Sequence, residues 1–443
     1  MVAPSLARSA KPHVAELLQR LVRYDTTNPP GNERECAAYC RDVLTDAGIA
    51  AELVGDDPNR VNVVSRLSGR GDAPPLLLYG HLDVVPTAAQ AWDVPPFEGR
   101  LQDGYIWGRG ALDMKGGVAM MMDAFMRAHL DGADLPGDVI LALVSDEEAG
   151  GNTGAAWLVR ERPELFDGVR YAMGEFGGFS KTYRGRKFYM AQVAEKQGCR
   201  VQATARGPGG HGSLVHHDTA PTRMAQFLVK LDKKPLPFHV HPVTRMMIEA
   251  IGARLPRLEG AFLQLLLNPR WTGRILRRMG PAGRELEPLF RHTANATIIN
   301  GGEKANVIPS EVAVNLDCRM LPGYDAEDLL GELQDIAGPN IELEAVNFQP
   351  KPWILNLGLF DTLASIISEQ DPESVSVPML MPAGTDGRHF ATLGIQTYGW
   401  MPMNLPADFD FLKTIHAANE RVPVSALEFG AEALYRLLLR FHE

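Results

Sequence analysis

The alternation of two hydrophobic patterns along the first 190 residues constrains the fold of this 443-residue chain most strongly. Three short apolar runs, Pro75–Tyr79, Val139–Ser145 and Arg170–Gly174, have the continuous hydrophobicity of strands buried inside a sheet. Val14–Val22 carries its apolar residues at helical spacing, and Lys115–His129, which lies between the first two runs, is rich in Met and Ala. Helices alternating with buried strands predict an α/β layer fold.

The pattern changes near residue 195. Arg200–Arg206 and Val312–Arg319 alternate apolar and polar residues, which is typical of strands covered on one side only. The intervening segment Pro242–Arg291 is basic, Leu-rich and helical in its spacing. From about residue 350, short continuous apolar runs like those of the first 190 residues occur again. We therefore predict one α/β domain, residues 1–194 and 350–443, interrupted by a smaller α+β insertion, residues 195–349.

The charge, the hydrophobic runs and the cysteines of the chain indicate which partners and which compartment to expect. Asp and Glu outnumber Lys and Arg by 54 to 44, a net charge of −10, so we expect neither nucleic acid nor a membrane as a partner. Met1–Pro12 has no apolar core of a signal peptide, and no run approaches the ~20 residues that span a bilayer. Cys36, Cys40, Cys199 and Cys318 are too scattered for a disulfide framework, and we expect a cytoplasmic protein.

A histidine and an aspartate, His81 and Asp83, follow the first predicted strand directly. Ligands of open α/β sheets bind at the carboxyl ends of the strands. The imidazole of His81 is a good Zn²⁺ ligand, and the carboxylate of Asp83 could orient it by accepting the other ring N–H. For this segment alone, a purely structural histidine is the more frequent interpretation.

Two further sets of carboxylates occupy comparable positions. Asp113 ends a glycine-rich segment just before the predicted helix Lys115–His129, where it could equally be a helix N-cap. Asp146, Glu147 and Glu148 follow the second predicted strand, and carboxylates in a row repel one another unless a cation or solvent compensates them. A metal ligand beside a general base requires two adjacent carboxylates of this kind, whereas the alternative is a solvated acidic turn.

Glu175 and His416 complete the set of candidate ligands. Glu175 follows the third predicted strand, and His416 lies far along the chain in the segment Ile415–Glu420. Considered alone, each of these two residues would be interpreted as a structural residue and not as a ligand. Together, two imidazoles and several carboxylates at the ends of successive strands suit a pair of zinc ions that share one bridging carboxylate.

Three segments resemble the metal motifs of a di-zinc hydrolase family, namely Gly80–Pro86, Gly108–Gly117 and Asp146–Glu148. This family contains aminoacylase, acetylornithine deacetylase, succinyl-diaminopimelate desuccinylase, glutamate carboxypeptidase and several dipeptidases, and the similarity runs in order from about Leu17 to the C-terminus. The resemblance implies a zinc-exopeptidase-like α/β/α catalytic domain with an inserted α+β domain of the ferredoxin-like type. The inserted domain would serve as a lid and as the interface of a homodimer.

The resemblance also implies the metal ligands, residue by residue. Asp113 would bridge the two metals, His81 and Glu175 would complete one site, and Glu148 and His416 would complete the other. The cofactors would be two divalent ions, zinc in the first place, with cobalt or manganese as alternatives. In the family the peptide bond that follows the bridging aspartate is usually cis.

Catalytic roles follow from the same resemblance. Glu147 would be the general base, and Asp83 would orient His81. In the insertion, the Gly-Gly-His turn at residues 209–211 resembles a lid motif whose histidine stabilises the oxyanion, often in the active site of the partner subunit. His211 is the residue at that position, although His216 and His217 leave the choice less certain.

Substrate contacts are implied in three further segments. Arg319 and Asn306 would hold a substrate carboxylate, for which the planar guanidinium is suited. Without the resemblance, an arginine on the exposed face of a strand would be interpreted as simply solvated. Gly384 and Thr385 lie in a turn that resembles a substrate-contacting turn of the family.

We therefore expect a metal-dependent hydrolase that cleaves an amide bond next to a free carboxylate, in N-acyl amino acids or small peptides. The alternative within the enzyme class is a dipeptidase or other exopeptidase that recognises a free α-amine. Its site should carry an extra carboxylate near the pocket mouth, and none is identified in the sequence. A metal-binding but inactive relative is a third hypothesis, whose signature would be the loss of Glu147 or of a ligand.

Overall fold

The computed structural model describes residues 12–348, 353 and 355–442. The chain divides into two compact units, which we treat separately. Unit 1 comprises Met1–Val193, Ile354–Met379 and Thr385–Glu443, and unit 2 comprises Ala194–Trp353 and Leu380–Gly384. The short segment Leu380–Gly384 thus belongs to unit 2, although it lies outside the predicted insertion.

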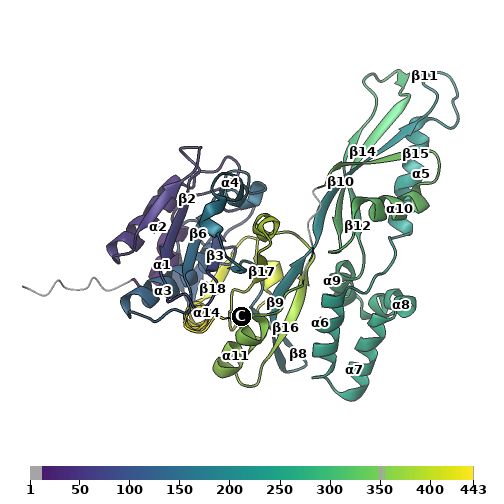
Figure 1. The fold of residues 1–443 in the computed structure, drawn as a ribbon. Helices are drawn as coiled ribbons and strands as arrows, with labels where there is room; N and C mark the ends of the chain where they lie inside the picture. The colour runs from purple at the N-terminus through teal and green to yellow at the C-terminus, as the bar shows by residue number, and fades with distance from the viewer. Residues whose placement is uncertain (1–11, 349–352, 354, 443) are drawn as a thin grey trace, which may run out of the picture. The chain divides into compact units, whose positions relative to one another are not determined.

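Unit 1 is built on a nine-stranded sheet (Figure 1). The central strands β6, β3, β7 and β17 are parallel, and β2 and β9 join them in antiparallel orientation. β8 pairs only with β9, and the other strands follow the order β1 (Ala51–Val54), β2 (Asn62–Leu67), β6 (Val139–Val144), β3 (Leu76–His81), β7 (Tyr171–Gly174), β17 (Gln396–Gly399), β9 (Arg186–Glu195) and β16 (Val375–Met381), with β8 at Ser180–Tyr183.

The three apolar runs predicted as strands are confirmed as β3, β6 and β7. Every residue of these three strands is buried, as expected for parallel strands covered on both faces. The predicted helix Val14–Val22 is confirmed as α1, and the helix predicted from Lys115 is α3 (Lys115–Leu130). The hydrophobic pattern of these segments is enough to predict their secondary structure, because each is long or fully apolar.

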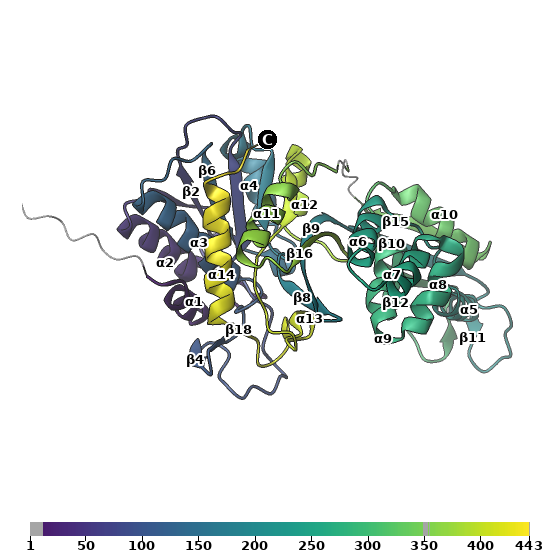
Figure 2. The same ribbon diagram turned by 90° about the horizontal axis from the view of Figure 1, so that it is seen from below.

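Helices cover both faces of this sheet, as Figure 2 shows. α3 packs against β3 and β6 and contacts α1 and α14, and α2 packs against β1 and β2. On the other face, α4 and Phe390 of α12 close a core with side chains of β3 and β6. The remaining bounds in unit 1 are α2 (Arg34–Asp46), α4 (Ala155–Glu161), α11 (Phe360–Gln370), α12 (Gly387–Phe390), α13 (Phe411–Thr414), α14 (Val424–Leu438), and a small sheet of β4 (Arg100–Gln102), β5 (Tyr105–Trp107) and β18 (Arg421–Pro423).

Unit 2 contains an antiparallel four-stranded sheet in the order β12, β14, β10, β15. With α5 after β10 and α10 after β14, the chain order is β-α-β-β-α-β, which is the ferredoxin-like topology. The alternating apolar residues of β10 and β14 pack in one core with α5 and α10. The bounds are β10 (Gln197–Arg206), α5 (Ala220–Lys233), β12 (Thr293–Asn300), β14 (Glu311–Met320), α10 (Ala326–Ala337) and β15 (Ile341–Asn347).

The predicted helical segment from Pro242 is confirmed, and it inserts four helices between α5 and β12. Three of the four begin at a proline, whose missing N–H and fixed φ suit the first position of a helix. The bounds are α6 (Pro242–Gly252), α7 (Arg257–Gln264), α8 (Pro269–Met279) and α9 (Pro281–Leu286).

Two short strands complete unit 2, β11 (Gly210–His211) and β13 (Val307–Ile308), which pair with each other. Across the described parts of both units, no helix combines the length and the apolar character that crossing a bilayer requires. The four cysteines are buried, free thiols, as their spacing predicts.

Candidate metal centre

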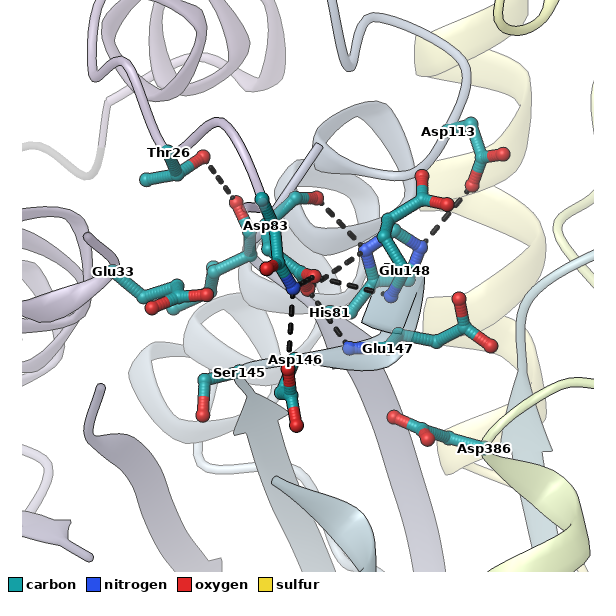
Figure 3. Close-up of polar contacts among 12 residues, drawn as sticks. Thr26, Glu33, His81, Asp83, Asp113, Ser145, Asp146, Glu147, Glu148 and Asp386 are labelled. Atoms are coloured by element: carbon teal, nitrogen blue, oxygen red, sulfur yellow. Dashed lines mark hydrogen bonds and ion pairs between the residues drawn. The ribbon is translucent and has the colours of Figure 1, made fainter. Parts of the chain in front are cut away.

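Three of the candidate side chains lie at one edge of the sheet of unit 1, and Figure 3 shows two of them, His81 and Glu148. His81 is the last residue of β3, Glu175 directly follows β7, and Glu148 lies in a short 3-10 helix, η1 (Glu147–Ala149), just after β6. Since β6, β3 and β7 are parallel neighbours, their carboxyl ends meet at the same edge, which is where open α/β sheets bind ligands.

Asp113 and His416 reach this edge from outside the sheet. Asp113 precedes the first turn of α3, and the peptide bond between Asp113 and Met114 is cis, as the family resemblance implies. His416 lies between α13 and β18 in a left-handed conformation, with φ of 59°. A non-glycine residue with this φ stores backbone strain, and such residues cluster at functional sites.

The five candidate ligands form two groups that share Asp113. In the first group, Nε2 of His81 lies 3.1 Å from Oδ1 of Asp113 and 3.4 Å from Oε2 of Glu175. In the second group, Nε2 of His416 lies 3.0 Å from Oδ2 of Asp113 and 3.3 Å from Oε1 of Glu148. Asp113 thus offers one oxygen to each group. Ligand atoms of a tetrahedral zinc ion stand roughly 3.3 Å apart, and these separations agree with that value.

His81 is oriented by Asp83, but not through the atom that the sequence indicated. Its Nδ1–H donates to the main-chain oxygen of Asp83 at 2.9 Å, whereas the Asp83 carboxylate oxygen is 3.5 Å away. The main-chain oxygen is therefore the better acceptor. The consequence for the ring is the one expected, because a proton on Nδ1 leaves the lone pair of Nε2 directed at Asp113 and Glu175.

The carboxylate of Asp83 instead holds the turn that carries the two glutamates. It accepts the main-chain N–H groups of Glu147 and Glu148, both at 3.1 Å, and the side-chain amide of Asn28 at 2.8 Å. Asp83 is completely buried, so these bonds act in a low dielectric, where they are strong. Asp83 thereby fixes the positions of Glu147 and Glu148 relative to His81.

A buried network behind this turn was missed by the sequence reasoning. Asn28 also donates to Asp146 at 3.2 Å, and the Arg60 guanidinium bridges Asp146 and Glu33, at 2.9 Å from each. Asp146 itself has φ of 73°. These residues come from separate segments, and no local motif other than the acidic run at Asp146 marks them in the sequence.

The donor set fits divalent cations. The pKa of His416 is raised to about 10 by its hydrogen bonds to Asp113 and Glu148, and burial opposes a charge on His81 but its hydrogen bonds to Asp113, Asp83 and Glu175 raise its pKa well above the usual range. The carboxylates around both imidazoles therefore favour positive charge at this place. Within the described residues, Oε1 of Glu175 is buried and accepts no hydrogen bond, and the buried Oε1 of Glu148 faces only Nε2 of His416 among the candidate ligands, at 3.3 Å. A buried carboxylate oxygen without a donor is costly unless a cation lies beside it.

Glu147 lies beside the ligands without joining either group. Burial, followed by the nearby carboxyl groups of Glu175 and Asp386, raises the pKa of Glu147 well above its usual value. A glutamate with a raised pKa at the edge of a metal site is a candidate general base.

A buried ion pair supports the loop that carries Asp113. Arg109 Nη1 lies 2.6 Å from Oε2 of Glu420, and Oε1 of Glu420 accepts the main-chain N–H groups of Leu112 at 2.8 Å and Asp113 at 3.2 Å. Both side chains of the pair are almost fully excluded from solvent.

We predict that Arg109→Met destabilises the fold by about 3–5 kcal/mol, because it leaves the carboxylate of Glu420 buried without its partner. Urea unfolding followed by circular dichroism measures this loss. The double variant Arg109→Met with Glu420→Gln should recover part of the stability. If the Arg109→Met protein unfolds at the same urea concentration as the wild type, the ion pair does not stabilise the fold.

The remaining predicted residues lie at three places. His211 and Asn306 are neighbours in unit 2, since β11 pairs with β13 and the main-chain N–H of Gly212 donates to the Asn306 oxygen at 2.8 Å. Thr385 is buried, and its hydroxyl accepts the main-chain N–H of Gly387, while Gly384 is the residue just before it.

Arg319 lies at the other end of the unit 2 sheet from His211 and Asn306. It pairs with Gly198 near the end of β14, whereas the start of β14, at Glu311, adjoins the β11–β13 pair. Eight residues of strand separate the two positions by roughly 26 Å. Within one chain, Arg319 and Asn306 are therefore too far apart to hold the same carboxylate, and their roles as substrate contacts stay a prediction.

A third group of potential ligands, His239, His292 and Glu332, lies in unit 2. Nδ1 of His292 accepts the main-chain N–H of Leu321 at 3.1 Å, so the ring proton of neutral His292 is on Nε2. This nitrogen lies 3.8 Å from Glu332, too far for a hydrogen bond, and has no lone pair for a metal. Glu332 is instead hydrogen-bonded to His239 at 2.6 Å, and we do not interpret the group as a further metal site.

The fold and the two histidine–carboxylate groups together define a metallohydrolase. The family model for peptidase family M20/M25/M40 matches residues 77–440, and the chain belongs to this family. It is thus a metal-dependent amidohydrolase.

Curated relatives and solved structures agree with this assignment. The chain is 28% identical to probable carboxypeptidase S-like 2 of Dictyostelium discoideum, with 82% of this chain and 71% of that protein covered. It is 27% identical to aminoacylase-1 of Sus scrofa, with 88% and 86% covered. The structure of an M20 family metallo-carboxypeptidase from Sulfolobus solfataricus matches with a TM-score of 0.67 at 17% identity, over 95% of this chain and 97% of the other.

Proposed function

We propose that the protein hydrolyses an amide bond next to a free carboxylate, in N-acyl amino acids or small peptides, at a two-zinc centre. The ligands would be His81, Asp113, Glu148, Glu175 and His416. The observation that carries the proposal is the position of Asp113, whose two oxygens each face one histidine and one glutamate. One carboxylate between two such groups is what a pair of metal ions requires.

When bound, the zinc ions polarise the scissile carbonyl and lower the pKa of a water molecule towards neutrality. Glu147 accepts a proton from the attacking water and passes it to the leaving amine. Asp83 keeps Glu147 in place for both steps by accepting its main-chain N–H. His211 donates to the oxyanion and thereby stabilises the tetrahedral species.

The substrate class is supported by the relatives. Besides aminoacylase-1, the relatives include the N-fatty-acyl-amino acid synthase/hydrolase PM20D1 of Bos taurus, which is 29% identical with 82% of this chain and 73% of that protein covered. Apolar side chains, among them Met114, Phe176 and Phe411, pack closely beside Asp113 and Glu175 and leave a space of only about 10 Å³.

Recognition of a free α-amine is the alternative specificity, and it needs an additional carboxylate near the site. The structure contains one that the sequence reasoning missed, Asp386, whose carboxyl group lies near that of Glu147 (Figure 3). Asp386 is only 1% exposed and lies 3.9 Å from Arg388 and 3.8 Å from His389. It therefore faces basic side chains of its own helix, and we favour the deacylase or carboxypeptidase type.

A release assay on the purified, zinc-loaded protein tests the proposal. The panel contains N-acetyl and longer-chain N-acyl amino acids, dipeptides, and matched dipeptides with a blocked N-terminus, each with zinc, cobalt or manganese. We expect turnover of N-acyl amino acids, with loss of activity when the substrate carboxylate is amidated. Turnover of free dipeptides alone would support the exopeptidase alternative, and no turnover of any amide would contradict the proposed function.

We further propose a homodimer in which unit 2 acts as lid and interface, with His211 serving the site of the partner subunit. The positions of Arg319 and His211 support this, because one chain cannot bring both ends of its own β14 to one substrate carboxylate. If Arg319 binds substrate in its own subunit, then His211 and Asn306 act on the partner's substrate. We also propose that the helices α6–α9 cover the pocket or extend the dimer interface.

The edge of the unit 2 sheet supports dimerisation. β12 is an edge strand, and its Ile298 and Ile299 are 50% and 62% exposed. An edge strand with exposed apolar side chains is a template for pairing with another chain. Pairing of two β12 strands would bury these residues in a closed, two-fold interface. A cytoplasmic location is part of the same proposal, since a reducing compartment keeps the four free cysteines reduced.

We predict that His211→Ala lowers kcat on the order of 10²–10³-fold, the effect of losing one oxyanion donor, with little loss of metal. Mixing this variant with Glu147→Ala should restore activity, because a mixed dimer holds one site with both intact groups. Analytical ultracentrifugation and mass spectrometry establish that subunits have exchanged. No recovery in exchanged dimers would exclude the action across subunits, and a fully active monomer would exclude the dimer.

A further inference from the structure

The carboxylate of Glu147 lies in a crowded, mostly buried position, with its side chain 12% exposed. Glu148 follows it in sequence, and the carboxyl groups of Glu175 and Asp386 are close enough to oppose its negative charge. Carboxylates that approach one another are pushed apart unless a positive group compensates them. The catalytic base therefore needs a means of staying in one orientation.

Arg388 provides a positive group at this place. Its Nη1 lies 3.7 Å from Oε1 of Glu147, within ion-pair distance, and its side chain is 24% exposed. Arg388 belongs to α12, which is part of unit 1, as is the turn that carries Glu147. None of the roles described above uses Arg388.

The helix that carries Arg388 is fastened to the turn that carries Glu147. Nε2 of His389 lies 3.2 Å from the main-chain oxygen of Gly150 and 3.1 Å from Nε of Arg388. A Cβ atom on Gly151 would lie 2.5 Å from Oδ1 of Asp386, and Gly151 has φ of 74°, so only glycine permits this approach. The guanidinium also lies 3.9 Å from Asp386, so it is within ion-pair distance of two carboxyl groups. The backbone that carries Arg388 is thus packed directly against the turn that carries the general base, Glu147.

We propose that Arg388 is a positioning residue for Glu147, holding the carboxylate of the general base in the orientation from which it reaches the attacking water. The inference rests on the proposed function of Glu147. Arginine suits the task because its planar guanidinium faces Glu147 with Nη1 and Asp386 with Nη2 in a fixed fork, whereas a lysine ammonium is a point charge on a more flexible stem.

Substitution of Arg388 tests the proposal through the split between kcat and KM. Misplacement of a catalytic group by about 1 Å costs up to roughly 10²-fold, so we expect Arg388→Met to lower kcat by about 10–10²-fold. KM and the zinc content should stay close to those of the wild type, and Arg388→Lys should recover part of kcat. Arg66→Met, which removes an exposed ion pair with Asp138 in the same unit, is the matched control and should leave kcat unchanged.

A double-mutant cycle then separates positioning from direct contact with substrate. In a Glu147→Gln background, Arg388→Met should cause no further loss, because the group that it positions is already absent. An equal loss in both backgrounds, or a raised KM with normal kcat, would show that Arg388 acts on the substrate and would overturn the proposal. Normal kcat in Arg388→Met would overturn it as well.

A crystal structure of the Arg388→Met protein gives a result that does not depend on any substrate. We expect the five metal ligands to stay in place while the Glu147 carboxylate moves or becomes disordered. An unmoved Glu147 would overturn the positioning role even if no amide substrate is found. Conversely, a moved Glu147 in a protein that hydrolyses none of the panel would sustain the positioning role and count against the proposed function alone.

Discussion

Replacement of Glu147 by Gln is expected to abolish nearly all turnover while the fold and the metal content stay unchanged. Glu147 lies beside a metal ligand, Glu148, but belongs to neither ligand group. Glutamine keeps the size of the side chain and its place on the turn but cannot accept the proton, and loss of a general base costs roughly 10²–10⁴-fold. The measurement is kcat of the purified variant together with its zinc content by mass spectrometry.

Glu148→Gln is the matched control for this experiment, because it makes the same chemical change one residue further on. Since Glu148 lies 3.3 Å from His416 in the second ligand group, its loss should weaken zinc binding, which the Glu147 variant should not do. If the Glu147 variant loses zinc, or if it retains a near-normal rate, the roles of the two adjacent glutamates have been assigned the wrong way round.

Asp113→Ala is expected to lose both metal ions together, whereas His416→Ala is expected to lose one preferentially. Asp113 offers Oδ1 to the His81 group and Oδ2 to the His416 group, so its removal takes a ligand from both sites. His416 contributes only to the second group. Metal-to-protein ratios after dialysis should fall to about zero and about one, respectively, against about two for the wild type.

Thermal unfolding of the same variants gives the control, because a ratio lowered by misfolding carries no information about ligands. Asn306→Ala, which changes a residue of unit 2, should keep the wild-type ratio. If the Asp113→Ala protein is folded and still holds two ions, Asp113 does not bridge the metals. The argument for a shared two-metal centre would then fail.

The parts of the fold that the sequence predicts are those whose pattern is determined locally. β3 and β6 are buried on both faces and are therefore continuous apolar runs, and β10 and β14 are covered on one face and therefore alternate. Strand ends also predict the ligands of the sheet edge, because parallel neighbours place His81 and Glu175 side by side. Asp113 and His416 follow no strand end, and their assignment as ligands came from the family resemblance.

Contacts between distant segments could not be predicted in this way. Asn28 reaches Asp146 across 118 positions of the sequence, and Arg109 reaches Glu420 across 311, and neither pair belongs to a repeating pattern. The atom that orients His81 was also beyond prediction, because the choice between a main-chain and a carboxylate oxygen of Asp83 depends on local backbone geometry.

The family resemblance assigns substrate contacts without saying how far apart they lie. It implies that Arg319 and Asn306 hold a substrate carboxylate, and the two residues stand 13 positions apart in the sequence. The antiparallel pairing of β14 with β10 shows that they lie at opposite ends of the sheet. Arg388, likewise, lies just beyond the turn at Gly384 and Thr385, and its relation to Glu147 emerges only once α12 is placed against the Glu147 turn.

Titration of the metal-free protein with zinc tests the central claim most directly. The amine released from the best N-acyl amino acid of the panel is measured at each addition of zinc. A centre in which one carboxylate joins two ions predicts negligible activity without metal and a maximum close to two equivalents of zinc per chain. Amide hydrolysis by the metal-free protein, or full activity at one equivalent with no change at the second, would contradict a two-metal mechanism at Asp113.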